Sequence, residues 1–390
     1  MGQAPADLGG EHPMRVLHII TGLAAGGAEQ QLRLLLRHLP AECTVATLTN
    51  PGAVATAIRD EGTPVVELGM RHNRDVSVLP RLVRLIKAGG YDLVHTHLYR
   101  ACVYGRLAAR VAGVPHIVAT EHSLGTALIE GRRTSAGVRV LYLATERLGD
   151  ATIAVSGAVA RRLAGWGVRP GRIVVLPNGV DAGEFTYDSA LRQLTRVRLG
   201  LSPSDRVVGA VGRLAPAKRF DVLVRAVSEI DGATLLLVGD GPERANLQEL
   251  ARAGGVASRV RFTGEAMDVG ALLCAMDVFA SPSEEETFGL AVLEALACGL
   301  PVRYVSCPAL EELSPSAAPH ARRLRLDVPR FRDELAVALR EPRSRLPPPA
   351  VGCYDIVRLA GQVAQLYELL QAGAPITTPR PETHPTAPSG

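Results

Sequence analysis

The sequence lacks most of the features that mark membrane-spanning, secreted or nucleic-acid-binding proteins. Aromatic residues make up only 4% of the 390 residues, with Trp166 as the single tryptophan, so aromatic stacking of single-stranded nucleic acid is not expected. No stretch approaches the roughly 18 apolar residues of a membrane span, and residues 1–13 contain no apolar run of a secretory signal. The six cysteines form no CxxC pair and no zinc-finger spacing with histidine, which predicts reduced thiols in a cytoplasmic protein.

Net charge is also low, but it is unevenly spread. The formal net charge is +4, and residues 1–185 carry 20 Lys and Arg against 15 Asp and Glu. A mildly basic first half can favour an anionic membrane surface or an anionic acceptor. Scattered, solvated arginines are the alternative explanation, and we favour it. We therefore expect a cytoplasmic protein in which any membrane contact is peripheral, at the inner face of the membrane.

Short apolar runs alternate with amphipathic segments of helical length, and this series occurs twice. The first series runs from "RVLHII" at 15–20 to "RIVVLPNGV" at 172–180, and the second starts with "DRVVGAVGRL" at 205–214. Strands that are separated by helices predict parallel sheets covered on both faces. The sequence therefore predicts an α/β protein of two doubly wound, Rossmann-like domains that face a cleft, with ligands bound beyond the carboxyl ends of the strands.

Changes in composition predict the domain boundaries. We expect an N-terminal domain over 14–190, a C-terminal domain over 200–345 and a final helix over 354–372. The proline-rich stretch 341–352 is typical of a linker. The tails at 1–13 and 374–390 are predicted to be disordered.

The most specific cluster for chemistry is "SPSEEETFGLAVLEALACGLPV" at 281–302, whose polar start and Gly/Pro end predict a helix. Glu286 would lie at the helix entrance and Glu294 eight residues later, at most about 12 Å away along the axis. This separation suits two carboxylates that address opposite ends of an elongated ligand. Ordinary first-turn acids that interact with the helix dipole are the alternative, which we favour for Glu284 and Glu285 but not for Glu294.

The start of the same helix is a candidate phosphate site. Phe288, Gly289 and Leu290 open the helix, so their backbone N–H groups have no partner within it. The helix dipole favours an anion at this end, and Gly289 allows a ligand to approach closely.

Basic residues follow the first strand of the second series. "VGRLAPAKRF" at 211–220 places Gly212 and Arg213 at the strand end and Lys218 before the next helix. Lys218 is one of only two lysines among 43 basic residues, the other being Lys87. A lysine offers a compact charge and an arginine a planar fork, so together they can neutralise a diphosphate. A solvated surface pair is the alternative, with equal weight on this segment alone.

Gly26 and Gly27 in "GLAAGGAE" form another glycine-rich turn between a strand and a helix. Such a turn permits close backbone approach to a ligand. It does not match the dinucleotide pattern GxGxxG, so a nicotinamide enzyme is poorly supported.

Three histidines lie near predicted strand ends. His95 and His97 in "DLVHTH" are expected to face opposite sides of their strand, so we predict structural roles for both and no metal site. His122 in "ATEHS" ends a strand at the expected cleft edge, where it can hydrogen-bond a ligand hydroxyl.

Several motifs occur in a recognisable order between about Met14 and Leu370. They are "GGAE", "DLVHTH", "AVSGAVARRL", "LPNGVD", "GRLAPAKRF", "VGDGP", "FTGE" and the Glu286/Glu294 pair. In this order and spacing the chain resembles the family-4 retaining glycosyltransferases of the GT-B fold. The resemblance implies transfer of a sugar from a nucleotide-diphosphate sugar to a hydroxyl acceptor in glycan, glycolipid or exopolysaccharide biosynthesis. It also implies retention of anomeric configuration without a bound metal or other cofactor.

The resemblance assigns the donor to the second domain. Arg213 and Lys218 would hold the diphosphate, and Glu294 would bind the ribose hydroxyls. Glu286 would contact the transferred sugar near the backbone of residues 288–290.

The first domain would complete the site from across the cleft. Gly26 and Gly27 would approach the reaction centre, and His122 would face the sugar or the acceptor. Across the cleft, Gly212 of the second domain would lie on the donor side. The resemblance leaves the acceptor open, with a lipid-linked hydroxyl among the options.

One segment departs from the family pattern. After "GLPV" the family has a polar loop with Gly-Gly, whereas this chain has Pro308-Ala309. Proline supplies no N–H and fixes φ, so a glycine-dependent turn must be rebuilt here, which bears on donor geometry and activity. Two alternatives to an active transferase therefore stay open, namely a non-catalytic relative that binds a nucleotide sugar and a nucleotide-sugar epimerase of the same fold.

Overall fold

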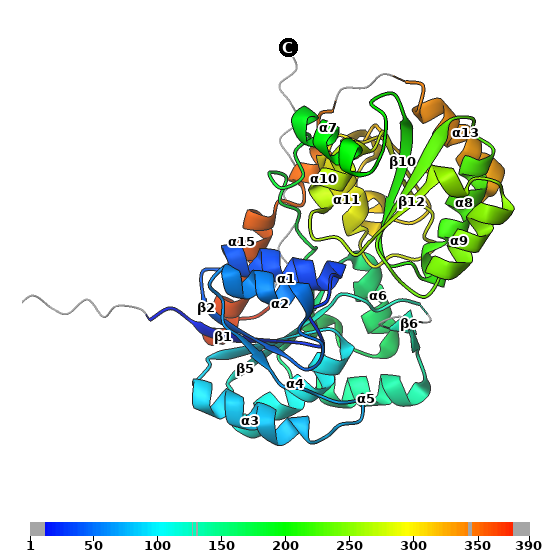
Figure 1. The fold of residues 1–390 in the computed structure, drawn as a ribbon. Coiled ribbons are helices and arrows are strands. Elements are labelled where there is room, and N and C mark those ends of the chain that lie inside the picture. The colour runs from blue at the N-terminus through cyan, green and yellow to red at the C-terminus, as the bar shows by residue number, and fades with distance from the viewer. Residues whose placement is uncertain (1–11, 127, 130–131, 342–344, 377–390) are drawn as a thin grey trace, which may run out of the picture.

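Two parallel sheets, each with helices on both faces, make up the computed structural model (Figure 1). It describes residues 12–126, 128–129, 132–341 and 345–376. The predicted tails beyond this range, at 1–11 and 377–390, and residues 342–344 of the predicted linker lie outside the described residues. The predicted α/β class with two doubly wound sheets is confirmed, and the linker segment contains a short helix, α14 (Pro349–Gly352).

The first sheet has seven parallel strands in the order β3-β2-β1-β4-β5-β8-β9. These strands are β1 (Arg15–Ile20), β2 (Glu42–Thr47), β3 (Val65–Glu67), β4 (Leu93–His97), β5 (His116–Glu121), β8 (Ala151–Ala154) and β9 (Ile173–Val175). The small antiparallel pair is β6 (Leu128–Ile129) and β7 (Arg132–Arg133). Strands β1, β4 and β5 are almost wholly buried because helices cover both faces of the sheet.

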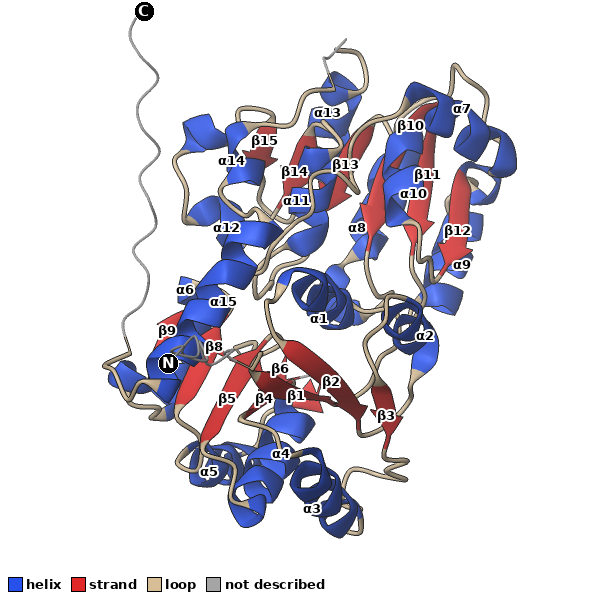
Figure 2. Cartoon of the chain, turned by 90° about the vertical axis from the view of Figure 1, so that its left-hand side faces the viewer, coloured by secondary structure: helices blue, strands red, loops and turns tan. Residues whose placement is uncertain are grey.

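Helices pack on the first sheet in two layers, which Figure 2 shows above and below it. The layer that faces the second domain contains α1 (Gly27–His38), α2 (Gly52–Asp60) and α15 (Ile356–Gln371). The opposite layer contains α3 (Val78–Gly89), α4 (Tyr99–Ala112) and α5 (Ala136–Glu146), and α6 (Gly157–Trp166) follows β8.

The second sheet has six parallel strands in the order β12-β11-β10-β13-β14-β15. They are β10 (Arg206–Val211), β11 (Ala233–Val238), β12 (Val260–Gly264), β13 (Val278–Ser281), β14 (Val302–Tyr304) and β15 (Ala321–Arg323). On one face lie α8 (Phe220–Ser228), α9 (Arg244–Ala253) and α13 (Val328–Ala338), and on the other α7 (Ser189–Arg198), α10 (Val269–Ala275) and α11 (Leu290–Ala297). Short elements are α12 (Pro308–Glu311) and the 3-10 turns η1 (Pro170–Arg172), η2 (Pro216–Lys218), η3 (Ala257–Arg259) and η4 (Pro315–Ala317).

The C-terminal helix returns to the first domain. Just before α15, the carbonyl of Tyr354 accepts a hydrogen bond of 2.7 Å from the Val180 N–H. Within α15, the Tyr367 hydroxyl lies 2.6 Å from Nδ1 of His95 on β4. The last helix therefore packs over the buried centre of the first sheet.

Each sheet has a point where the strand order reverses. In the first sheet the reversal lies between β1 and β4, and in the second between β10 and β13. Loops that leave neighbouring strands in opposite directions open a crevice at this point, where ligands of such sheets bind.

Candidate active site between the two sheets

Lys218 and Glu286 meet at the switch point of the second sheet. Lys218 lies in η2 after β10, and Glu286 lies in the loop after the neighbouring strand β13. The Lys218 Nζ donates a hydrogen bond of 2.6 Å to the Glu286 Oε1. Both side chains are mostly covered, with 28% and 16% of their surfaces exposed. The structure thus joins two candidates that are 68 residues apart.

Arg213 and Gly212 lie on the same side of this pair. Gly212 directly follows β10, and a Cβ at this glycine would lie 3.6 Å from Cε of Lys218. The Arg213 side chain is exposed. Among the residues that the structure describes, it has no ion-pair partner, so its guanidinium is available to a ligand.

Glu294 is the predicted site residue with the most perturbed carboxyl. It lies on α11, half-buried, whereas Glu286 precedes α11 by four residues because this helix begins at Leu290. The expectation that Glu286 sits at the helix entrance is therefore only approximate. Burial, and secondly the negative charge of Glu184, raise the pKa of Glu294 to about 7. A ligand that donates hydroxyls would relieve this cost by solvating the carboxylate.

The start of α11 has backbone N–H groups that find no partner within the helix. Gly289 caps the helix with φ 102°, a conformation that side chains with a Cβ rarely adopt. A Cβ at this position would also lie 2.4 Å from the Cys307 Sγ. The hydrogen bonds of the described residues leave the N–H groups of Phe288, Gly289 and Leu290 without a partner, which suits an anion.

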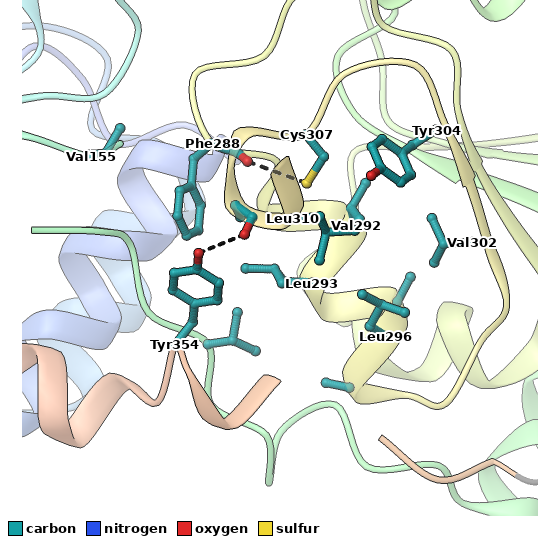
Figure 3. Packing of buried hydrophobic residues seen from close by; sticks show 14 of the residues in the cluster. Val155, Phe288, Val292, Leu293, Leu296, Val302, Tyr304, Cys307, Leu310 and Tyr354 are labelled. Carbon is teal, nitrogen blue, oxygen red and sulfur yellow. Dashed lines mark hydrogen bonds between the residues drawn. The ribbon is translucent and has the colours of Figure 1, made fainter. Parts of the chain in front are cut away.

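The segment with Pro308-Ala309 packs against this loop, and Figure 3 shows the neighbouring side chains of Phe288, Cys307 and Tyr354. Pro308 is the first residue of α12, a position where a missing N–H costs nothing. The Ala309 N–H donates to the Phe288 carbonyl at 3.0 Å, and the Tyr354 hydroxyl donates to the Ala309 carbonyl at 2.7 Å. The Phe288 and Tyr354 rings pack edge to face at 5.1 Å. In place of the Gly-Gly loop of the family, this chain therefore has a helical turn that begins at Pro308 and holds Phe288 in position.

The first domain contacts the same loop through His122 and Gly27, which the sequence singled out, and through Ser156, which it did not. The Thr287 Oγ1 donates to the His122 carbonyl at 2.6 Å, and the Ser156 Oγ donates to the Thr287 carbonyl at 2.6 Å. A Cβ at Gly27 would lie 3.4 Å from Leu290. Ser156 also caps α6. A serine directly before a helical segment is typical of a helix cap, so the sequence offered this much of a signal for Ser156. Nothing in the sequence pointed to Thr287.

The acids that precede Glu286 pair with arginines rather than with the site. Glu284 is exposed and lies 3.3 Å from a nitrogen of Arg219. Glu285 lies 3.1 Å from a nitrogen of Arg162 in the first domain. The interpretation of these two acids as ordinary charged residues agrees with their contacts.

His122 follows β5 at the edge of the cleft. Burial lowers the pKa of its imidazole to about 4, although the neighbouring Asn178 side chain acts in the opposite direction. The ring is therefore neutral at physiological pH. Its Nδ1 is buried and makes no hydrogen bond of standard geometry among the described residues, but the Asn178 side chain interacts with the ring.

The prediction that His95 and His97 face opposite sides of β4 is wrong. Residues two apart in a strand share a face, and the two ring centroids lie 4.1 Å apart. His95 is satisfied by Tyr367 and by Thr120, whose Oγ1 lies 2.7 Å from its Nε2, as a structural histidine should be. Together with His18 of β1, the two rings form a buried group whose nitrogens lie within 4.8 Å of one another and can hold a metal ion.

Two family models match the chain in succession. Residues 25–184 match Glycosyltransferase Family 4, and residues 205–320 match Glycosyl transferases group 1. The chain is thus similar to glycosyltransferase family 4 over its first domain and to glycosyl transferases group 1 over its second. The recognition of that family and of its GT-B fold from the sequence is confirmed.

Curated relatives of this chain include proteins named D-inositol 3-phosphate glycosyltransferase. The protein from Salinispora tropica is 37% identical over an alignment of 246 residues, with coverage of 55% of this chain and 50% of the relative. The protein from Mycobacterium marinum is 34% identical over 230 residues, with 55% and 48% coverage. The chain thus aligns with about half the length of these relatives.

Solved structures share the whole fold. Anabaena HepE in complex with UDP and glucose has a TM-score of 0.79 at 22% identity and covers 90% of this chain and 98% of its own. The sucrose-phosphate synthase from Thermosynechococcus elongatus has a TM-score of 0.74 at 22% identity, with 93% and 100% coverage. At this identity the likeness establishes the GT-B fold alone.

Proposed function

We propose that the chain transfers a sugar from a nucleotide-diphosphate sugar to a hydroxyl acceptor, with retention of configuration and without a metal cofactor. The observation that carries this proposal is the Lys218–Glu286 pair at the switch point, beside the unpartnered N–H groups that open α11. Positive charge, helix N-terminus and a carboxylate converge where a sugar diphosphate presents phosphate next to hydroxyls. This arrangement favours an active enzyme over a non-catalytic binding relative.

The proposal gives each cleft residue a separate task. Lys218 and Arg213 neutralise the diphosphate, and the N–H groups at residues 288–290 donate hydrogen bonds to its oxygens. Glu286 exchanges its bond to Lys218 for a hydroxyl of the transferred sugar. Glu294 accepts hydrogen bonds from the ribose hydroxyls.

The reaction breaks the bond between the anomeric carbon and the phosphate oxygen and forms a bond from the same face to the acceptor oxygen. The acceptor proton passes to the leaving phosphate, so atoms and charge balance. Negative charge grows on the leaving diphosphate, and it is stabilised by the α11 terminus and by Lys218 once Lys218 has exchanged its bond to Glu286 for the phosphate. The contacts of Thr287 with His122 and Ser156 bring the domains together, which excludes water from the donor.

The chain offers matched controls for a test of this site. Lys218→Ala is expected to lower acceptor-dependent release of nucleoside diphosphate about 100-fold, whereas Lys87→Ala on α3 should leave it unchanged. Glu286→Gln should have an effect similar to that of Lys218→Ala, and Glu284→Gln should have none. Equal rates in Lys218→Ala and wild type would reject the assignment.

Three further measurements separate the alternatives. Product NMR should show the anomeric configuration of the donor, and a chelator should leave the rate unchanged. Conversion of the donor sugar without any acceptor would instead identify an epimerase. Donor binding without turnover across the acceptor screen would support a non-catalytic role.

The donor and acceptor can be narrowed by screening. Thermal unfolding with UDP-, GDP- and ADP-sugars should show one preferred nucleotide, because a ligand stabilises the state that it binds. UDP-glucose is the first donor to try, given the ligands named for HepE. D-inositol 3-phosphate is the first acceptor to try, given the names of the curated relatives.

We also propose peripheral membrane contact through α4 and α5. These helices pack together and expose apolar side chains, namely Leu107, Val111, Val140 and Leu141. Exposed arginines flank them at 110, 139 and 147, which suits an anionic surface. No helix among the described residues has the length and apolar character to cross a bilayer. A vesicle sedimentation assay tests this contact. The protein is expected to sediment with anionic vesicles but not with neutral ones, and Val111→Glu is expected to abolish this binding.

A further inference from the structure

A row of hydrogen-bonded side chains runs through the first sheet to the cleft. Nε2 of His18 lies 3.7 Å from the Cys43 Sγ, and Nδ1 of His18 lies 3.0 Å from Nε2 of His97. Nδ1 of His97 lies 3.2 Å from Nε2 of His122. The row thus passes from β2 through β1 and β4 to the residue after β5. His18 and His97 are fully buried at 0% and 1% exposure.

Proton counting leaves this row only two arrangements. Burial holds the pKa of His18 near 3 and that of His97 well below its ordinary value, so both rings are neutral. A neutral imidazole carries one hydrogen, so each ring donates at one nitrogen and accepts at the other. All hydrogens in the row therefore point either toward His122 or toward Cys43, and the choice fixes the tautomer of His122.

The thiol end selects the direction. Burial, with a smaller contribution from Glu42, raises the pKa of Cys43 to about 12, so its sulfur keeps a hydrogen to donate. Sulfur is a weak acceptor, whereas the lone pair of an imidazole nitrogen is a good one. A row that starts with S–H directed at His18 satisfies every nitrogen in turn. At the far end, the hydrogen of His122 then lies on Nδ1.

We propose that His18 and His97 are positioning residues that fix the tautomer of His122, so that its Nδ1 donates a hydrogen bond into the cleft. This Nδ1 is buried and makes no hydrogen bond of standard geometry among the described residues, and a ligand oxygen would bind it beside the Asn178 side chain. Its acceptor, an oxygen of the transferred sugar or of the acceptor substrate, rests on the proposed function. His122 is therefore a hydrogen-bond donor and not a general base.

A metal ion is the competing use of the same nitrogens. The closest pair, Nδ1 of His18 and Nε2 of His97, already lies at hydrogen-bond distance. His95, the third member of the group, has a partner at both ring nitrogens, Tyr367 and Thr120. Because a metal would have to displace one of these bonds, the hydrogen-bonded row accounts for the geometry better.

Long-range ¹H–¹⁵N NMR of histidine-labelled protein tests the row without donor or acceptor. His122 is expected to carry its hydrogen on Nδ1 in the wild type. It should keep it there in His97→Asn, whose amide can donate from the position of the lost Nδ1. His97→Leu should release the tautomer, and His95→Asn, on the same strand, should not. A hydrogen on Nε2 of His122 in the wild type would overturn the proposal.

Variants of Cys43, at the β2 end of the row, test the same proposal without changing a buried histidine, whose replacement can prevent folding. Cys43 is only half-buried. Cys43→Ser keeps a donor and should preserve the tautomer, whereas Cys43→Ala removes the donor and should increase the Nε2 form. Identical spectra for the two variants would show that the thiol does not set the direction. Elemental analysis that finds one equivalent of a transition metal, lost in His18→Leu, would overturn the hydrogen-bonded row.

Kinetics then test what the Nδ1 hydrogen does. His97→Leu should lower kcat roughly tenfold, the effect of one hydrogen bond, with KM for the donor within about twofold. His97→Asn should restore kcat, which a merely structural role would not produce. A tautomer change with unchanged kcat would overturn the role of this N–H, whereas an inactive wild type would count against the proposed function and leave the NMR result standing.

Discussion

The buried carboxyl of Glu294 is expected to lower the stability of the folded protein and to strengthen binding of the donor. Replacement of Glu294 should therefore raise stability and weaken donor binding. Its carboxyl is half-buried on α11, and burial together with Glu184 raises its pKa from 4.5 to about 7. The folded protein therefore holds this proton more tightly than the unfolded chain does. Glu294→Gln keeps the shape and hydrogen-bonding atoms and removes the ionisation.

The sign and size of the effect follow from linkage. Below pH 4.5 the carboxyl is protonated in both states and costs nothing. Between pH 4.5 and 7 the unfolded chain loses the proton first, so the free energy of unfolding falls as pH rises, and above pH 7 the loss is complete. A shift of this size corresponds to at most about 3 kcal/mol, of which about 2 kcal/mol develops between pH 5.5 and 8.

Urea unfolding at pH 5.5 and pH 8 measures this difference. Glu294→Gln is expected to be more stable than wild type at both values, with a gain that is about 2 kcal/mol larger at pH 8. Glu249→Gln, in an exposed pair with Arg252 on α9, is the control and should change stability by less than about 0.5 kcal/mol. A gain that is independent of pH, or a loss at pH 8, would refute the reasoning.

The same variant should lose ligand affinity. An amide accepts hydroxyl hydrogen bonds more weakly than a carboxylate, so UDP binding at pH 8 should weaken about tenfold. A residue that lowers stability and improves binding is typical of functional sites. Unchanged UDP affinity in Glu294→Gln would place the ribose elsewhere.

The remaining predictions concern the loop before α11. Gly289→Ala should destabilise the protein by more than about 2 kcal/mol through strain and its clash with Cys307, and adding Cys307→Ala should recover only part of this, as thermal unfolding can show. Tyr354→Phe should cost about 1 kcal/mol in urea unfolding, because the Ala309 carbonyl loses its partner, and no change would mean that the bond contributes nothing. Thr287→Val should raise KM for the donor three- to tenfold, by roughly one hydrogen bond, without lowering stability, because it breaks a contact between the domains.

The sequence by itself determined the architecture and supplied most of the candidate residues for the donor side of the proposed site. Strands and helices alternate with strong periodicity, and parallel sheets require that alternation, so two doubly wound domains follow from local patterns. Glu294 and Lys218 were identifiable because a carboxyl among apolar neighbours and a rare lysine stand out in composition. The sequence also predicted that a helix begins near Gly289.

Only the tertiary structure decided which of these side chains meet. Lys218 pairs with Glu286 because β10 and β13 are neighbours, although their loops are far apart in sequence. From the sequence, Pro308 was expected to disturb the donor loop. In the structure it is the first residue of the helical turn whose Ala309 N–H binds the Phe288 carbonyl. The row from Cys43 to His122 crosses four strands, and its hydrogen bonds depend on sheet order and register, which no local pattern encodes.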